Sequence, residues 1–145
     1  MSDPRRPQGG SRDGGEDGPQ GGPPGGFVPG RHLIDAYGAG GFRFAEMSHR
    51  GSILALPSGV RAWEVTEASA IDRDALRPVQ AEAGAIELLL VGTGLDIVPL
   101  PAPLRAWLKE NGIGLDVMQT GAAARTYNIL VAENRKVAAA LIAVA

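Results

Sequence analysis

The sequence predicts an α/β fold: a mixed central sheet flanked by helices, with an antiparallel β layer from the N-terminal half. Residues 31–66 contain short apolar runs with short gaps, which favour antiparallel pairing because parallel neighbours need a long crossover. Residues 86–144 alternate apolar runs with helical patterns, which is typical of right-handed βαβ units. The first 26 residues contain almost nothing that could join a core, so the fold is expected to begin after them.

The N-terminal segment, residues 1–26, is expected to be a disordered tail. Nine of its residues are Gly and five are Pro, and Met1 is its only large apolar residue. Such a composition cannot bury enough apolar surface to offset the entropy cost of ordering. Its three arginines and four acidic residues nearly cancel, so it is not a basic arm. Residues 27–145 then form a single α/β domain, which is long enough for one hydrophobic core.

The first half of this domain is expected to consist of β-strands. Glycines end the first of these strands, and a Pro-Ser-Gly turn ends the third. The expected strands are "HLIDAYG" (32–38), "FRFAEM" (42–47), "GSILAL" (51–56) and "VRAWEV" (60–65).

In the second half of the domain, the spacing of apolar residues changes, and helical patterns alternate with apolar runs. Pro78 weakens the first helical pattern, whereas Pro103 near the start and Gly112 just past the end support the second. The run at 86–92 is nearly all apolar, as in a strand that is covered on both faces. The expected order is helix 72–84, strand 86–92, helix 103–111, strand 113–118, a helix beginning near Thr120, and strand 136–144.

Composition excludes several classes of protein. The 145 residues include 14 Lys and Arg against 16 Asp and Glu, and the net charge of −2 argues against a nucleic-acid binder. The absence of cysteine excludes disulfides, thiolate nucleophiles and cysteine-based zinc sites. The longest apolar run has nine residues, far fewer than the ~20 that a membrane-spanning helix needs. The N-terminus lacks the apolar core of a signal peptide, so a cytoplasmic protein is expected.

No catalytic constellation stands out. The sequence contains neither G-x-S-x-G nor H-E-x-x-H, and His32 and His49 lack the spacing of paired metal ligands. We therefore expect no catalytic residue, metal or cofactor, and the residues favour a non-enzymatic role.

A possible anion site lies where ligands usually bind in such sheets, beyond the carboxyl ends of parallel strands. Gly92, Thr93 and Gly94 follow a buried strand, but a dinucleotide fingerprint would need a third glycine opening directly into a helix. A tight turn that allows close packing is the alternative, and the sequence favours it.

The helix that begins "TGAAAR" supplies the other half of this site. Thr120 can cap the helix, and Gly121 and its small neighbours leave the first amides open to an anion. Arg125 could then close over the anion as its counter-charge. In the alternative, Thr120 is a structural cap, Arg125 is a surface side chain, and the small residues serve packing against the sheet.

The same helix has two contrasting faces. A stripe of Ala123, Tyr127, Leu130 and Val131 is expected to face the sheet. On the opposite side, four residues are candidates for contact with a partner protein. They are Arg125, Ile129 and Glu133, spaced by four, with Asn128 on the flank, where it could hydrogen-bond a nearby loop.

Five stretches of the chain resemble a known family of small bacterial proteins of unknown function. These proteins are related to mitochondrial respiratory complex I assembly factor three. The matching stretches are "IDAYGAGGFRF" (34–44), "GSILALPSGVRAW" (51–63), "LLLVGTG" (88–94), the pair Pro103 and Arg105, and residues 112–144.

The resemblance implies a three-layer β/β/α-type domain with Rossmann-like βαβ units. It also implies a role through protein contacts, with respiratory-chain assembly components as partners and the inner membrane reached only through such a partner. The first hypothesis is thus a non-enzymatic assembly or interaction protein. The alternative is a binder of an anionic small molecule or nucleotide, or an enzyme, with its site at Gly92–Gly94 and the Thr120 helix start.

Overall fold

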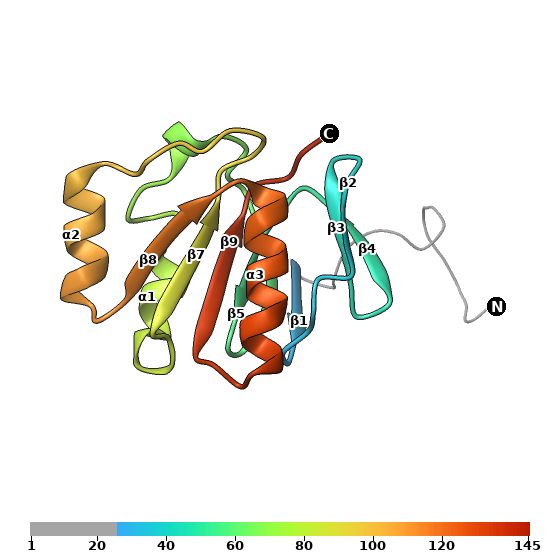
Figure 1. The fold of residues 1–145 in the computed structure, drawn as a ribbon, viewed down its shortest axis with the longest axis horizontal. Helices are drawn as coiled ribbons and strands as arrows, with labels where there is room; N and C mark the ends of the chain where they lie inside the picture. Colours follow the sequence, from blue (N-terminus) through green and yellow to red (C-terminus); the bar gives the residue numbers. More distant parts are fainter. Residues whose placement is uncertain (1–25) are drawn as a thin grey trace.

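The computed structural model describes residues 26–145, which combine α-helices with β-strands (Figure 1). The tail expected at residues 1–26 lies outside the described residues except for Gly26. The strands are β1 (Phe27–Pro29), β2 (Ala36–Gly38), β3 (Gly41–Phe44), β4 (Met47–Arg50), β5 (Ser52–Leu56), β6 (Gly59–Trp63), β7 (Leu88–Gly92), β8 (Gly114–Met118) and β9 (Val137–Leu141). The α-helices are α1 (Arg77–Ala81), α2 (Ala102–Glu110) and α3 (Thr120–Ala132), and short 3₁₀ turns span Ala68–Ala70 and Ala83–Ala85.

Six strands form the central sheet, in the order β1-β6-β5-β9-β7-β8. Strand β7 lies between β8 and β9 and is parallel to both, whereas β9–β5, β5–β6 and β6–β1 are antiparallel. The predicted mixed sheet with βαβ units is therefore confirmed. The carboxyl ends of β7, β8 and β9 consequently lie at the same edge of the sheet, which is where α3 begins.

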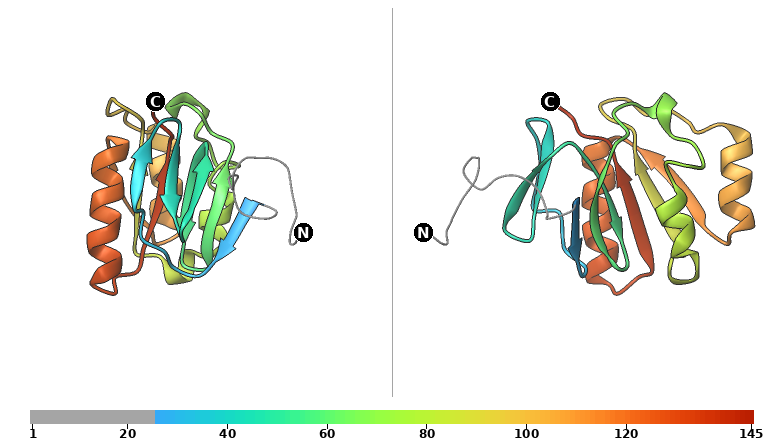
Figure 2. Two further views of the ribbon diagram at one scale, coloured as in Figure 1. Left: turned by 90° about the vertical axis from the view of Figure 1, so that its right-hand side faces the viewer. Right: turned by 180° about the vertical axis from the view of Figure 1, so that it is seen from behind.

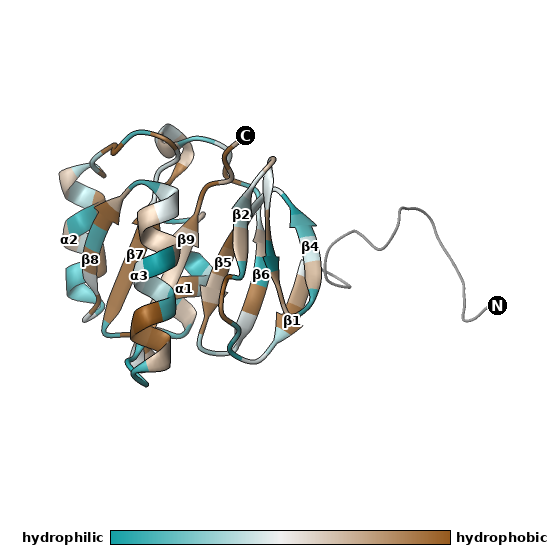
Figure 3. Ribbon diagram, turned by 45° about the vertical axis from the view of Figure 1, so that its right-hand side comes forward, coloured by the Kyte–Doolittle hydropathy of each residue, from teal (hydrophilic) through white to brown (hydrophobic). Residues whose placement is uncertain are grey.

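Each face of the central sheet is covered by a separate hydrophobic cluster, so that the fold has three layers (Figure 2). On one face, α1 and α2 pack through Val79, Trp107 and Leu108. On the other face, α3 and the small β2-β3-β4 sheet pack side by side through Tyr127 and the phenylalanines of β3. Figure 3 shows hydrophobic residues along β7 and β5, as strands covered on both faces require.

Small side chains allow α3 to lie close to the sheet. Strand β9 reads Val-Ala-Ala-Ala-Leu and is fully buried. On α3, Ala123 and Tyr127 are fully buried, while Leu130 and Val131 are partly buried, so the predicted inner stripe is confirmed. Because the alanines of β9 and α3 have little volume, the backbones of the strand and the helix approach closely.

The second sheet corrects one expected strand. "FRFAEM" is not continuous, because Ala45 and Glu46 form the tight turn between β3 and β4. Both residues have positive φ, 51° and 61°, which is the backbone of a type I′ hairpin turn. Neither is the Asn or Gly that such a turn favours, so the sequence carried no signal of it.

The N-terminal half also divides differently from the expectation. Only β2, β3 and β4 form the separate antiparallel layer, while β5 and β6 extend the central sheet alongside β9. Strand β1 was not expected, and it pairs with β6 at the edge of the same sheet. Backbone pairing between β5 and β9 links the two halves of the chain, and periodicity in the sequence does not reveal such long-range partners.

Candidate functional site

The two loops of the expected anion site meet, and they bind each other. The Thr93 amide donates to the Met118 carbonyl at 3.0 Å, and the Thr120 amide donates to the Gly94 carbonyl at 2.9 Å. The Gly94 amide in turn donates to Thr120 Oγ1 at 2.9 Å. The predicted adjacency of the two loops is therefore confirmed, and both the amide and the hydroxyl of Thr120 are already paired within the protein.

Thr120 ties the ends of three chain segments together. Its hydroxyl donates to the Ile142 carbonyl at 2.7 Å, and the Ile142 amide donates to the Gly92 carbonyl at 2.9 Å. Gly92 is needed here, because a Cβ on it would lie 2.8 Å from Thr120 Cα. The expected role of Thr120 as the helix cap is wrong: Gln119 occupies the N-cap position, and the Thr120 side chain binds neighbouring strand ends instead.

Gly121 and Arg125 occupy different environments. A Cβ on Gly121 would collide with the hydroxyl group of Tyr37, so this tyrosine packs directly over the start of α3. Arg125 is exposed one turn further along. The structure thus brings Gly92, Gly94 and Thr120 together, covers Gly121 with Tyr37, and leaves Arg125 on the surface. Ligand binding by this group stays a prediction.

The outer face of α3 carries the residues that were predicted to contact a partner. Arg125, Ile129 and Glu133 are exposed, and 59% of the Ile129 surface is accessible. Asn128 is partly buried and hydrogen-bonds the backbone of Ile34 at 2.8 Å in both directions, which confirms the expected bond to a nearby segment.

Three exposed apolar residues on the loop after β7 were missed by sequence reasoning. Leu95, Ile97 and Val98 are 71%, 60% and 40% exposed. Thr93 orders this loop, because its hydroxyl donates to the Asp96 carbonyl at 2.6 Å and accepts from the Val98 amide at 3.0 Å. The available signal was an apolar stretch between Gly94 and Pro99 that belongs to no helix or strand.

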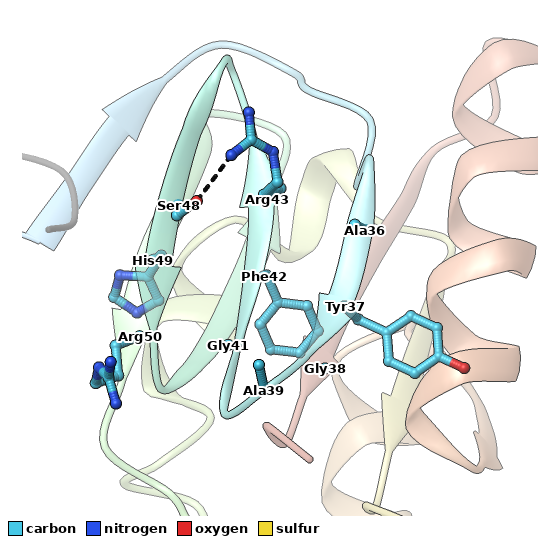
Figure 4. Close-up of a pocket in the computed structure, with 10 residues that line it drawn as sticks. All are labelled: Ala36, Tyr37, Gly38, Ala39, Gly41, Phe42, Arg43, Ser48, His49 and Arg50. Carbon is cyan, nitrogen blue, oxygen red and sulfur yellow. Dashed lines mark hydrogen bonds between the residues drawn. The ribbon is translucent and has the colours of Figure 1, made fainter. Parts of the chain in front are cut away.

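Sequence reasoning also missed a hollow on the outer side of the β2-β3-β4 sheet (Figure 4). This open hollow has a volume of about 720 Å³. Arg43, Ser48 and Arg50 stand along it, and Arg43 Nη1 donates to Ser48 Oγ at 3.0 Å. Arg43 lies on a strand whose expected end was wrong, and Ser48 and Arg50 lie on a strand that was not expected, so their common face could not be predicted.

Two titratable side chains, those of His49 and Tyr127, are buried. Burial lowers the pKa of His49 below 6.5, against the opposing effect of a hydrogen bond to the Ser52 backbone. Burial raises the pKa of Tyr127 above 10.0, and the charge of Arg31 opposes this. Within residues 26–145, neither His49 Nδ1 nor the Tyr127 hydroxyl has a hydrogen-bond partner. Both groups are therefore held in their neutral forms near neutral pH.

Over the described range, no three His, Asp or Glu side chains gather closely enough to hold a metal ion. The helices of residues 26–145 are also too short or too polar to cross a membrane.

Comparison with known proteins places the chain in a family. A family model described as "Protein of unknown function (DUF498/DUF598)" matches residues 34–142, most of the part that the structure describes. The chain belongs to this family. An uncharacterised protein of Rhodobacter capsulatus is 40% identical over 109 residues, covering 75% of this chain and 82% of that protein.

Relatives that are described as assembly factors confirm the resemblance seen in the sequence. NADH dehydrogenase (ubiquinone) 1 alpha subcomplex assembly factor 3 of Xenopus tropicalis is 30% identical over 110 residues. The match covers 76% of this chain but 60% of the frog protein, so this chain spans about three fifths of that relative.

A solved structure supports the fold. The crystal structure described as an outer membrane protein from Bartonella henselae has a TM-score of 0.78 and 51% sequence identity. The alignment covers 81% of this chain and 98% of the Bartonella chain. The fold described above is therefore shared with the Bartonella protein over about four fifths of this chain.

Proposed function

We propose that this protein is a non-enzymatic assembly factor that binds partner proteins in the biogenesis of a respiratory NADH dehydrogenase. The names of its relatives support the process, because assembly factor 3 matches 76% of this chain. The proposed place of action is the cytoplasm, with the inner membrane reached through the partner.

The observation that carries the contact role is the exposure of Ile129. This side chain is 59% exposed at the middle of α3, with Arg125 and Glu133 one turn away on either side. An aliphatic centre with a charged rim is the usual composition of a protein interface. Burying such a side chain in a partner contributes roughly 1.5–3 kcal/mol.

Packing and hydrogen bonds hold this surface in place without a partner. The inner face of α3 is buried against β7 and β9, and Asn128 fixes the segment that contains Leu33 beside the helix. Leu33 itself is 46% exposed, and it precedes Ile34, the residue that Asn128 holds beside α3. A preordered surface loses little conformational entropy on binding, which favours recognition by a small number of side chains.

The test is recovery of partners from the native host. The tagged full chain is crosslinked gently, and proteins that co-purify from detergent-solubilised membranes and from cytosol are identified. We expect subunits of the NADH dehydrogenase or its assembly intermediates to be enriched. We expect the double variant Arg125→Glu with Ile129→Asp to lose at least tenfold of that recovery, as removal of ~1.5 kcal/mol or more of apolar contact requires.

The loop after β7 provides a matched control. Ile97 is 60% exposed, almost the same fraction as Ile129, but it lies outside α3. The variant Ile97→Asp should leave recovery unchanged. Unchanged recovery in the α3 variant, or loss in Ile97→Asp alone, would exclude the outer face of α3 as the contact surface. Circular dichroism of each variant checks that the fold is intact.

A further inference from the structure

Strand β4 presents a free edge. Among the described residues it pairs with β3 alone, in a register that places Arg43 opposite Ser48 and Gly41 opposite Arg50. The Arg43 carbonyl accepts from the Asp35 amide at 2.8 Å, so the backbone groups of Arg43 face β2. In an antiparallel pair, when the backbone groups of one residue point away from the partner strand, those of the opposing residue point away too. The amides and carbonyls of Ser48 and Arg50 therefore point away from the sheet.

Two guanidinium groups stand above this edge. Cross-strand pairing puts Arg43, Ser48 and Arg50 on one face of the small sheet, and all three are exposed. The 3.0 Å bond from Arg43 Nη1 to Ser48 Oγ directs the Arg43 guanidinium towards β4 (Figure 4). No carboxylate of residues 26–145 lies within 4.0 Å of either arginine's nitrogens. Positive charge is thus available beside unpaired backbone groups.

The hollow described above lies on this same face. Its floor contains Ala36, Gly38 and Gly41, so no large side chain fills it. Extended chain that paired with β4 would pass beside the hollow and could place a side chain over this floor. The backbone edge, the arginines and the hollow therefore form one continuous surface, which we call the β4 edge site.

We propose that the β4 edge site binds an extended, acidic segment of a partner protein, which adds to β4 as a fourth strand. Strand addition uses backbone hydrogen bonds for affinity and alternate side chains for selectivity. Ser48 and Arg50 are two residues apart, about 7 Å along a strand. Acidic residues at positions i and i+2 of a partner strand have the same spacing. One would meet the Arg43 guanidinium at Ser48, and the other would meet Arg50.

The surrounding charges limit where such a segment binds. Glu46 is exposed at the β3–β4 turn, and it repels acidic side chains from that end of β4. Asp35 precedes β2 and so lies towards the opposite edge of the small sheet. The favourable region for acidic residues is consequently Ser48 to Arg50. This site does not include the outer face of α3, and it does not depend on the assembly role proposed above.

The test uses the full chain and two synthetic heptapeptides of the same composition. In one, Glu alternates with Thr; in the other, the glutamates are adjacent. NMR titration and amide hydrogen exchange are the measurements. We expect the alternating peptide to shift the resonances of Ser48 and Arg50 and to slow exchange of both amides, because these amides gain acceptors. We expect the isomer to bind roughly fivefold more weakly, since two exposed ion pairs contribute modestly.

Variants of the full chain distinguish strand addition from nonspecific electrostatic attraction. Arg43→Glu with Arg50→Glu should weaken binding of the alternating peptide by roughly fivefold or more. The control, Arg105→Glu with Lys109→Glu, reverses two exposed charges on α2 and should leave binding unchanged. Ser48→Pro removes one outward amide and the side-chain bond from Arg43, but no backbone bond to β3, and it should also abolish protection at Arg50.

Three results would overturn the proposal. The first is equal binding of both peptides without slowed exchange at Ser48 and Arg50. The second is absence of any binding. The third is equal weakening by the α2 control. If the α3 variants lose partner recovery but retain peptide binding, the two surfaces act separately, and failure of one proposal leaves the other standing.

Discussion

The side chain of Asn128 pairs with both backbone groups of Ile34. Its Nδ2 donates to the Ile34 carbonyl at 2.8 Å, and its Oδ1 accepts from the Ile34 amide at 2.8 Å. A residue of the last helix thereby takes the place of a strand neighbour for a segment 94 positions earlier in the chain. This pairing holds the start of the small sheet against α3.

Asn128→Ala should destabilise the protein by about 2 kcal/mol, because two partly buried backbone groups lose their partners. Asn128→Asp should cost at least as much, since a carboxylate oxygen would then face the Ile34 carbonyl. Urea unfolding of both variants measures the change. Gln119→Ala is the control, because it removes a single exposed bond and should have little effect. Equal stability of wild type and Asn128→Ala would contradict the pairing.

Gly92→Ala should destabilise the junction between β7 and α3. The added Cβ would meet Thr120 Cα at 2.8 Å, and backbone must move to admit it. Overpacking of this kind costs roughly 1–3 kcal/mol. Gly84→Ala is the matched control, because a Cβ there meets nothing within 4 Å. Thermal unfolding of the pair measures the difference, and a neutral Gly92→Ala would show that the strand ends are not closely packed.

The β3–β4 turn should be improved by the residues its backbone prefers. Ala45 and Glu46 have φ of 51° and 61°, which is strained for residues with a Cβ. Ala45→Asn with Glu46→Gly should raise the free energy of unfolding by about 1 kcal/mol. Glu46→Ala keeps the strain and should bring no gain. If Glu46→Ala stabilises equally, removal of charge and not backbone geometry is responsible.

Stability should fall in acid partly through His49. Burial lowers its pKa in the folded protein below the ordinary 6.5, so the unfolded chain takes up a proton that the folded protein does not. This contribution is complete above pH 6.5 and is lost as the pH falls towards the lowered folded pKa. Between pH 7.5 and pH 5.0, the unfolding free energy of His49→Leu should fall less than that of wild type. A constant difference would contradict a buried neutral histidine.

Much of the candidate surface could be predicted from the sequence, because α3 is one long helix with a clear period. Helical spacing alone placed Ile129 outside and Tyr127 inside, and both positions are confirmed. The pairing of Asn128 with a nearby segment was also predicted, although its partner was not. The β4 edge site was not predicted, because recognising it requires knowing that Ala45 and Glu46 turn the chain.

The expected anion site also combines a feature that the sequence predicted with one that it did not. Adjacent parallel strands placed the Gly92–Gly94 loop beside the start of α3, as the βαβ pattern predicted. The use of the Thr120 hydroxyl could not be predicted, because its acceptor, the Ile142 carbonyl, lies 22 residues away, just after β9. A side chain that could cap a helix can also bind a strand end, and packing decides which occurs.

The sequence by itself determined the alternation of strands and helices in the second half, the buried character of β7 and β9, and the two faces of α3. These follow from local periodicity, since burial of one face selects the spacing of apolar residues. Only the tertiary structure decided which strands are neighbours, where the small sheet lies, and which polar groups remain unpaired. Those outcomes depend on contacts between residues far apart in the chain, where backbone hydrogen bonds and close packing, and not local pattern, choose the partners.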